Sequence, residues 1–179
     1  MPEIFKNSVI RRVGDVTSNT SGSIAANSNS ITSLTSTIGV SVGDLVDNQH
    51  FINGTKVSIV GANDVTVDTP SLNTAPVTNQ AVSLVGMTTV FTASTAKSIL
   101  IGGTFCNNTR DQIQLSVELF DSSTGTSAQL VGRVPVPSGS SFVLSDSGKT
   151  VLELDDSIHV YCNADNGVDV TLAILEGVN

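Results

Sequence analysis

Aromatic residues are scarce in this chain, which has six Phe, one Tyr and no Trp among its 179 residues. Aromatic rings supply large apolar contact surfaces, and sugar-binding sites usually present such rings to solvent. Their scarcity therefore argues against carbohydrate recognition. A carbohydrate-binding adhesin nevertheless stays the main rival hypothesis, because the composition implies an exterior rich in hydroxyl groups.

Charged residues are also few, at 13% of the chain, whereas globular domains average roughly a quarter. Their place is taken by 24 Ser and 20 Thr. Disordered chains are typically rich in charge and poor in Val and Ile, yet β-branched residues occur throughout this sequence. We therefore expect an ordered β protein with a hydroxyl-covered surface.

Basic residues are the scarcest charged type, so the net charge is −8. A nucleic-acid-binding surface needs clustered Lys and Arg, and Arg11-Arg12 is the only basic pair.

No apolar run approaches the ~20 residues that span a membrane, and the N-terminal sequence lacks the apolar core of a signal peptide. We expect neither a nucleic-acid nor a membrane partner, synthesis in a cytoplasm, and reduced thiols at Cys106 and Cys162, although a disulfide between them stays an alternative.

Histidine, the commonest general base, occurs only at His50 and His159. We expect His159 to lie on the solvated face of a strand and His50 to lie in a loop. The two histidines lie far apart in the sequence, so the sequence gives no support to a Ser–His–Asp triad. Glu118 and Glu153 are expected on wet strand faces, which does not favour a paired-carboxylate site. We therefore predict no enzymatic activity, no catalytic residue and no cofactor.

One cluster of acidic and amide residues is dense enough to suggest a calcium site, and its members are Asp155, Asp156, Asn163, Asp165, Asn166 and Asp169. Calcium prefers oxygen ligands, and these residues would provide them if the two turns that carry them met at one end of the fold. Aspartate also favours turns for backbone reasons. The spacing does not match an EF-hand loop, so we predict no metal site.

Period-two alternation is the clearest structural signal. Residues 111–120, DQIQLSVELF, place apolar side chains on one face and polar side chains on the other, and residues 168–175 repeat the pattern. Such alternation predicts strands with one wet side. Further strands are expected at 98–105, 130–136, 141–144, 150–154 and 158–162, separated by Gly-, Asn- and Asp-rich turns. Pro135 favours an edge strand, because proline cannot donate to the ladder. The fold expected for residues 88–179 is an antiparallel β-sandwich.

The earlier part of the chain has a different texture, with isolated apolar residues in a Ser-, Thr- and Asn-rich background. Residues 56–60 and 65–67 predict a hairpin around the turn at 61–63. We expect a small β-barrel or sandwich over residues 15–86, inserted into a discontinuous β-sandwich made of residues 1–14 and 87–179. Insertion into an exposed turn is physically inexpensive, since the cost of closing a loop grows only logarithmically with its length.

Four stretches of the chain carry a family resemblance: MPEIFKNSVIRRVG at 1–14, MTTVFTASTAKSILIGGTFCNNT at 87–109, LVGRVPVPSGSSFVLSDSGKTVLELDDSIHV at 130–160, and VDVTLAILEG at 168–177. Together they resemble a family of small virion proteins of tailed bacteriophages. Within the insertion, SNSITSLTSTIGVSVGDLV and NGTKVSIVGANDVTVDT resemble a β module that is repeated in phage tail and surface proteins.

The resemblance implies a structural protein of the virion, assembled in the host cytoplasm. We expect a capsid decoration (cement) protein first, with a neck, collar or tail accessory protein as the alternative. Its implied partners are the major capsid protein or other virion components, and further copies of itself. Residues Ile4, Phe5, Val9, Ile10, Arg11 and Arg12 are the candidate docking arm; alternatively, the same segment is simply the first strand of the sandwich.

Overall fold

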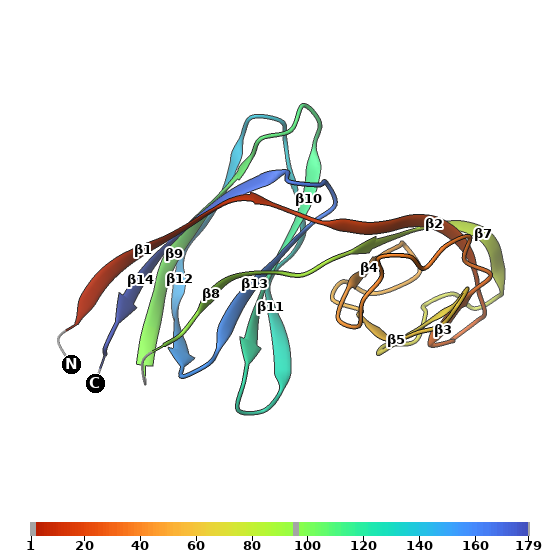
Figure 1. The fold of residues 1–179 in the computed structure, drawn as a ribbon, viewed down its shortest axis with the longest axis horizontal. Coiled ribbons are helices and arrows are strands. Elements are labelled where there is room, and N and C mark those ends of the chain that lie inside the picture. The colour runs from red at the N-terminus through yellow and green to blue at the C-terminus, as the bar shows by residue number, and fades with distance from the viewer. Residues whose placement is uncertain (1–2, 95–96, 179) are drawn as a thin grey trace. The chain divides into compact units, whose positions relative to one another are not determined.

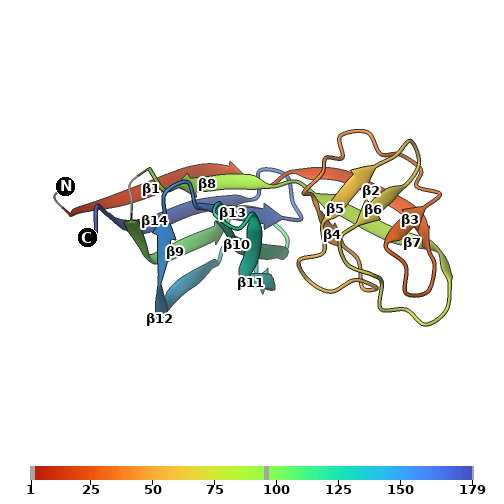
Figure 2. The same cartoon turned by 90° about the horizontal axis from the view of Figure 1, so that it is seen from below.

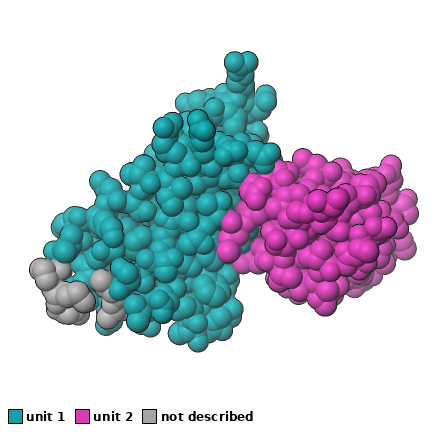
Figure 3. All heavy atoms as spheres, viewed as in Figure 1, with its two compact units in different colours: residues 1–14, 88–179 teal, residues 15–87 magenta. Residues whose placement is uncertain are grey.

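The computed structural model describes residues 3–94 and 97–178. Their regular structure consists of β-strands, and none of the elements in these ranges is a helix long and apolar enough to cross a membrane. The chain divides into two compact units, which Figure 3 shows in different colours. Unit 1 comprises Met1–Gly14 and Thr88–Asn179, and unit 2 comprises Asp15–Met87. The expected insertion, 15–86, differs from unit 2 by one residue, Met87.

Unit 1 contains eight strands in two four-stranded sheets (Figures 1 and 2). The first sheet has the order β1-β14-β9-β12 and the second has the order β11-β10-β13-β8. The bounds are β1 Ile4–Val13, β8 Thr88–Thr92, β9 Lys97–Asn107, β10 Ile113–Asp121, β11 Thr126–Val136, β12 Ser141–Glu153, β13 Ser157–Cys162 and β14 Val168–Glu176. All pairs within the two sheets are antiparallel. The predicted all-β antiparallel sandwich is thus confirmed.

The order of the strands makes unit 1 a jelly roll. β1, β9, β12 and β14 lie in one sheet and β8, β10, β11 and β13 lie in the other, so the chain repeatedly crosses between the layers. Double-sheet jelly rolls have eight strands wound as two Greek keys, and viral capsid and lectin domains use them. Such crossings bring pairs of strands that are distant in sequence together, as with β1 and β14.

The core of unit 1 lies between its two sheets. The alternating apolar residues that predict β10 and β14 point into it: Ile113, Leu115 and Val117 from one sheet, and Val168, Val170, Leu172 and Ile174 from the other. Each position exposes 2% of its surface or less. Gly103 lies on β9 opposite Leu172 of β14, and an added Cβ would come within 2.8 Å of the Leu172 side chain, so glycine leaves room for Leu172 in the core.

Two local predictions for unit 1 have different outcomes. Pro135 lies on β11, which is the edge strand of its sheet as predicted. The turn expected at 146–148 is wrong as a strand boundary, because β12 runs unbroken from Ser141 to Glu153. The pairing of β12 with β9 shifts register between Ser145 and Thr150. The turn-forming residues lie in a bulge of β12, because extra residues on one strand can stay unpaired without ending its hydrogen-bonded ladder.

Unit 2 has six strands in the order β4-β7-β2-β3-β6-β5. Their bounds are β2 Val16–Ile24, β3 Ser30–Thr32, β4 Leu45–Asp47, β5 Val57–Val60, β6 Val65–Val67 and β7 Val77–Val85. β5 and β6 pair as the predicted hairpin. An isolated bridge between Leu45 and Lys56 joins the two ends of the sheet, so the sheet curls closed around its own core, which includes Ile24, Ile31 and Leu84.

Candidate functional site

The candidate docking-arm residues form strand β1, which pairs with β14 along its length and is an edge strand of the first sheet. The segment is therefore the first strand of the sandwich, which is the second of the two expectations for it. Its apolar residues do not make one surface. Phe5 and Val9 point away from the core, whereas Ile10 packs against it. Ile4 is exposed near the end of the sheet.

The strand register defines the outward face of the first sheet, which we call the outer face. Directly opposed residues in antiparallel strands point to the same side of a sheet. Three rows of residues cross all four strands in the order β1, β14, β9, β12: Phe5–Leu175–Ile99–Val151, Asn7–Ala173–Gly102–Ser145, and Val9–Thr171–Thr104–Val143. The first row is apolar throughout, and the third is apolar at both edges.

Several apolar side chains of the outer face are open to solvent. The exposed fractions are 77% for Phe5, 62% for Val9, 57% for Val143 and 51% for Val151. Between the two bulkier rows runs a row with the small residues Ala173 and Gly102 at its centre, and the exposed bulge residue Ile101 lies next to Gly102 on β9. Single exposed apolar residues are ordinary, but contiguous apolar patches of several hundred Å² usually mark interaction sites.

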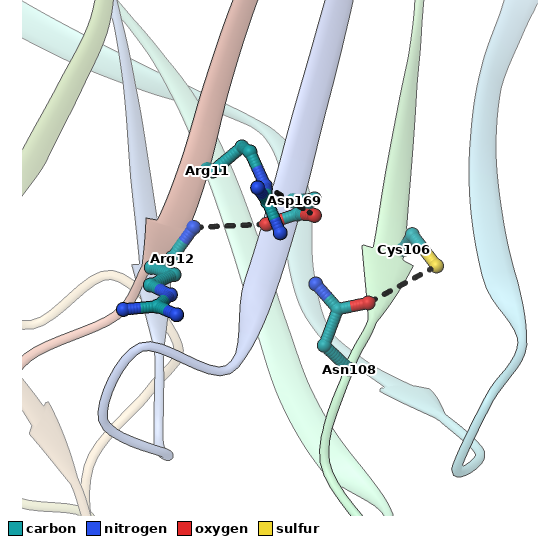
Figure 4. A network of polar contacts seen from close by, with 5 residues as sticks. All are labelled: Arg11, Arg12, Cys106, Asn108 and Asp169. Atoms are coloured by element: carbon teal, nitrogen blue, oxygen red, sulfur yellow. Dashed lines mark hydrogen bonds and ion pairs between the residues drawn. The ribbon is translucent and has the colours of Figure 1, made fainter.

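At one end of the outer face, the carboxylate of Asp169 on β14 contacts Arg11 and Arg12 on β1 (Figure 4). Its Oδ1 accepts a hydrogen bond from the main-chain N–H of Arg12 at 2.9 Å, and its Oδ2 lies 3.4 Å from Arg11 Nε. Arg12 has a φ of 60° at the bulge where β1 shifts register. The Arg12 N–H chiefly, assisted by the side chains of Asn108 and Arg11, holds the pKa of Asp169 below its usual value.

The two cysteines lie in different environments, and both thiols are free. Cys106 lies opposite Asp169 on the outer face, with its Sγ 3.7 Å from Asn108 Oδ1 (Figure 4). Cys162 is buried in the core of unit 1, and burial raises the pKa of its thiol. A buried thiol that stays protonated is a poor nucleophile, so Cys162 behaves as a small core residue.

A second cluster lies on the second sheet, where the sequence predicts solvated side chains. His159 and Glu118 were expected on wet strand faces, and for both residues this is wrong, since they expose only 6% and 1% of their surface. They are opposed residues of β13 and β10, and Ser157 and Tyr161 flank His159 at period two. The prediction holds for Glu153, which is exposed.

These four side chains form one hydrogen-bonded chain, which we call the buried polar chain. Ser157 Oγ lies 2.8 Å from His159 Nε2, and His159 Nδ1 lies 3.2 Å from Glu118 Oε1. The Tyr161 hydroxyl donates to the same Glu118 oxygen at 2.9 Å. If Nδ1 carries the imidazole proton, it donates to Glu118, and Nε2 can accept from Ser157. Phe120 stacks on the imidazole with 5.7 Å between ring centroids.

The connectivity of the buried polar chain is that of a nucleophile, a base and an orienting carboxylate. Sequence reasoning missed it, because it arises from cross-strand pairing and not from a local motif. The available signal was Ser, His and Tyr at alternate positions of 157–161, together with a carboxylate in another predicted strand. Ser157 and His159 each expose only 6% of their surface, so both residues of this pair are largely covered in this conformation.

The hypothetical calcium site required two turns to meet, and they do not. Asp155 and Asp156 precede β13, whereas the turn at 163–167 follows it, so the strand holds the two turns at its opposite ends. The Asp156 carboxylate accepts hydrogen bonds from the main-chain N–H groups of Ser122 and Glu153. Within residues 3–94 and 97–178, no group of three or more His, Cys, Asp or Glu side chains is gathered in a way that could hold a metal ion.

His50 lies in a turn of unit 2. Its main-chain N–H donates to Asn48 Oδ1 at 2.8 Å, and its Nε2 lies 3.3 Å from Gln80 Oε1. Asn48 in turn donates to the Ala81 carbonyl oxygen. These contacts fasten the turn to β7, so His50 has a structural role there.

The chain was compared with protein-family models, with curated proteins and with solved structures, and no match was found in any of the three.

Proposed function

We propose that this protein is a non-enzymatic structural component of a tailed-phage virion, namely a capsid decoration protein that docks on the particle through its sandwich. The observation that carries the proposal is the outer face, where Phe5, Val9, Val143 and Val151 are exposed on a paired sheet. A paired sheet presents such side chains at fixed spacing, which suits docking between rigid parts.

The sequence resemblance and the topology support the same proposal. The stretches that resemble phage virion proteins fall on the strands of unit 1, including β1, β9, β13 and β14. The jelly roll formed by these strands is an architecture that viral capsid domains use. Fold alone does not determine function, so the topology is an analogy, and the exposed apolar rows provide the physical argument.

The decisive experiment is quantitative mass spectrometry of purified particles. A decoration protein is present in hundreds of copies, because the shell repeats its binding site by symmetry. A neck, collar or tail accessory protein, which is the alternative position, is present in about six to twelve copies, since ring-shaped assemblies contain few subunits. Absence of the chain from intact particles would refute both positions.

A carbohydrate-binding adhesin is the second candidate function, and the jelly roll favours it because lectin domains share this architecture. The only tyrosine, Tyr161, exposes 2% of its surface and bonds to Glu118, so it is not a solvent-exposed platform for a sugar. Among the residues that the structure describes, Phe5 has the most exposed aromatic ring. We expect the purified protein to give no signal on a glycan array while it binds empty capsids. The reverse result would favour the adhesin.

The buried polar chain favours one further candidate, a serine hydrolase with Ser157 as nucleophile. A fluorophosphonate probe reacts with an activated serine hydroxyl and leaves a covalent adduct that mass spectrometry locates. We expect no adduct on Ser157, because Phe120 and the neighbouring strands bury it. Labelling of Ser157 that disappears in a His159→Gln variant would overturn the non-enzymatic proposal.

A further inference from the structure

We propose that the outer face of the first sheet is the surface on which two copies of this chain pack face to face. The inference rests on the proposed function in one respect, the assignment of the outer face as an assembly surface. It assigns that face to a contact with a second copy of the same face, so the resulting dimer contacts the particle through the remaining surface of the sandwich. The shape, the size and the charge of the face favour this occupant.

The shape of the outer face suits another sheet. The two bulkier rows, which start at Phe5 and Val9 on β1, lie on either side of a row with the small residues Ala173 and Gly102 at its centre. Face-to-face sheets pack about 10 Å apart with their side chains interdigitated. The bulkier rows of one copy can pack against the row of small residues of the other, and a two-fold axis makes the contact self-complementary.

The size of the outer face is sufficient for a weak to moderate dimer. Four strands about 4.8 Å apart, paired over nine residues of β14, span roughly 20 Å by 30 Å. Two such faces would bury on the order of 1,200 Å² in total, which is the lower end of the range for specific interfaces. The exposed bulge residue Ile101 adds apolar surface to this area.

The charge of the outer face permits a second copy and disfavours an anionic membrane. Among the described residues that have a register partner, four charged side chains lie there, two of each sign: Arg11 and Asp169 at one end, Lys97 and Glu153 at the other. The whole chain carries a net charge of −8, so two copies repel each other through most of their surface. The balanced charges at the paired positions of the outer face let two copies approach there, whereas an anionic membrane would require a basic excess.

The two edge strands, β1 and β12, supply the variants that test the inference. Val9→Asp on β1 and Val143→Asp on β12 each place a charge in the row Val9–Thr171–Thr104–Val143 of the outer face. Ile59→Asp is the matched control, because Ile59 lies in unit 2 and exposes 60% of its surface against 57% for Val143. Exposed positions of this kind rarely alter folding by more than about 0.5 kcal/mol, and circular dichroism verifies that each variant is folded.

The experiment is sedimentation velocity of the full chain over a range of protein concentrations. We expect the unmodified protein to dimerise, the double variant Val9→Asp/Val143→Asp to weaken association at least about tenfold, and Ile59→Asp to leave it unchanged. A protein that stays monomeric at roughly 100 µM, where interfaces of this size are normally populated, would overturn the inference. Equal weakening by Ile59→Asp would overturn it too.

Binding to empty capsids separates the failure of this inference from the failure of the proposed function. A monomeric protein that binds capsids through the outer face, and loses binding in the double variant, refutes the dimer and retains the virion role. A dimer that is absent from purified particles retains the inference and refutes the virion role.

Discussion

At the scale of single residues, the bulge in β1 depends on one carboxylate. Asp169 accepts the main-chain N–H of Arg12 and lies beside the Arg11 side chain, and these contacts lower its pKa from the usual value of 3.8. A carboxyl group whose folded pKa is depressed stabilises the fold above its unfolded pKa. That stabilisation is lost as the pH falls through the folded pKa. Its acid sensitivity therefore lies below about pH 4.

We expect Asp169→Asn to be less stable than the unmodified protein at pH 7, and we expect this difference to shrink towards pH 3. Urea unfolding at both pH values measures it. Asp111→Asn is the control, because within the described part of the chain the hydrogen bonds of Asp111 are made by its main chain. A gap that persists unchanged at pH 3 would show that the charge of Asp169 is not what stabilises the bulge.

Glu118 is the residue on which the buried polar chain depends, since the Tyr161 hydroxyl donates to its Oε1 and His159 Nδ1 lies 3.2 Å from the same oxygen. Glu118→Leu would leave both buried groups without that partner. We expect a loss of about 2–4 kcal/mol in the free energy of unfolding. Glu118→Gln keeps an acceptor oxygen and should lose less. Urea denaturation of both variants gives the comparison.

The control for Glu118 is Glu153→Gln, because Glu153 lies on an exposed strand position. A substitution there should change the free energy of unfolding by no more than about 0.5 kcal/mol. If Glu118→Leu were as stable as the unmodified protein, the buried polar chain would make no net contribution to stability.

At the scale of elements, alternation in the sequence is sufficient to locate the strands of unit 1. β10 and β14 match their predicted segments, because apolar residues at every second position have one way to reach a core in a sheet. The same alternation fails for His159 and Glu118. It tells which side chains share a face, but not whether aromatic rings and neighbouring strands cover that face.

The pairing of strands explains the remaining differences. The rows of the outer face combine residues from the N-terminal segment, from the middle of the chain and from the C-terminal segment. A single sequence does not show which residues of such distant strands lie opposite each other. The outer face and the buried polar chain both depend on that pairing, so neither could be predicted from the sequence. β12 was predicted as two pieces because turn-forming residues interrupt it, and its bulge depends on the partner strand β9.

The end of β1 provides a prediction at the same scale. Gly14 has a φ of 121°, and an added Cβ would lie 2.2 Å from the carbonyl oxygen of Ala164. Gly125 also has a positive φ, 67°, but nothing lies within 4 Å of its added Cβ. We expect Gly14→Ala to cost more than about 3 kcal/mol, because backbone strain and a clash with the main chain combine.

Gly125→Ala should cost only about 1 kcal/mol, since it carries the conformational strain alone. Thermal denaturation of the two variants therefore separates the clash from the strain. Equal losses would mean that the 163–167 turn moves away from Gly14 at little cost, despite the hydrogen bond from Asn166 N–H to the Gly14 carbonyl oxygen.

At the scale of the whole molecule, the two units have separate cores. The buried apolar residues of unit 1 form one cluster and those of unit 2 form another, with no residue in common. The first and last residues of unit 2 also lie side by side. Val16 pairs with Val85 across β2 and β7, and the Gly86 N–H donates to the Asp15 carbonyl oxygen at 2.7 Å. Chain ends that lie this close characterise segments that tolerate excision.

We therefore expect unit 1 to fold after residues 15–87 are replaced by a short Gly-Ser linker between Gly14 and Thr88. The shorter loop lowers the entropy cost of closure slightly, and the jelly-roll core keeps all its members, so the thermal midpoint should stay within a few degrees. Residues 15–87 expressed alone should fold too, because the Leu45–Lys56 bridge closes their sheet without residues from unit 1. Circular dichroism and calorimetry of both pieces measure this. Cooperative unfolding of the full chain combined with two unfolded pieces would show that the cores depend on each other.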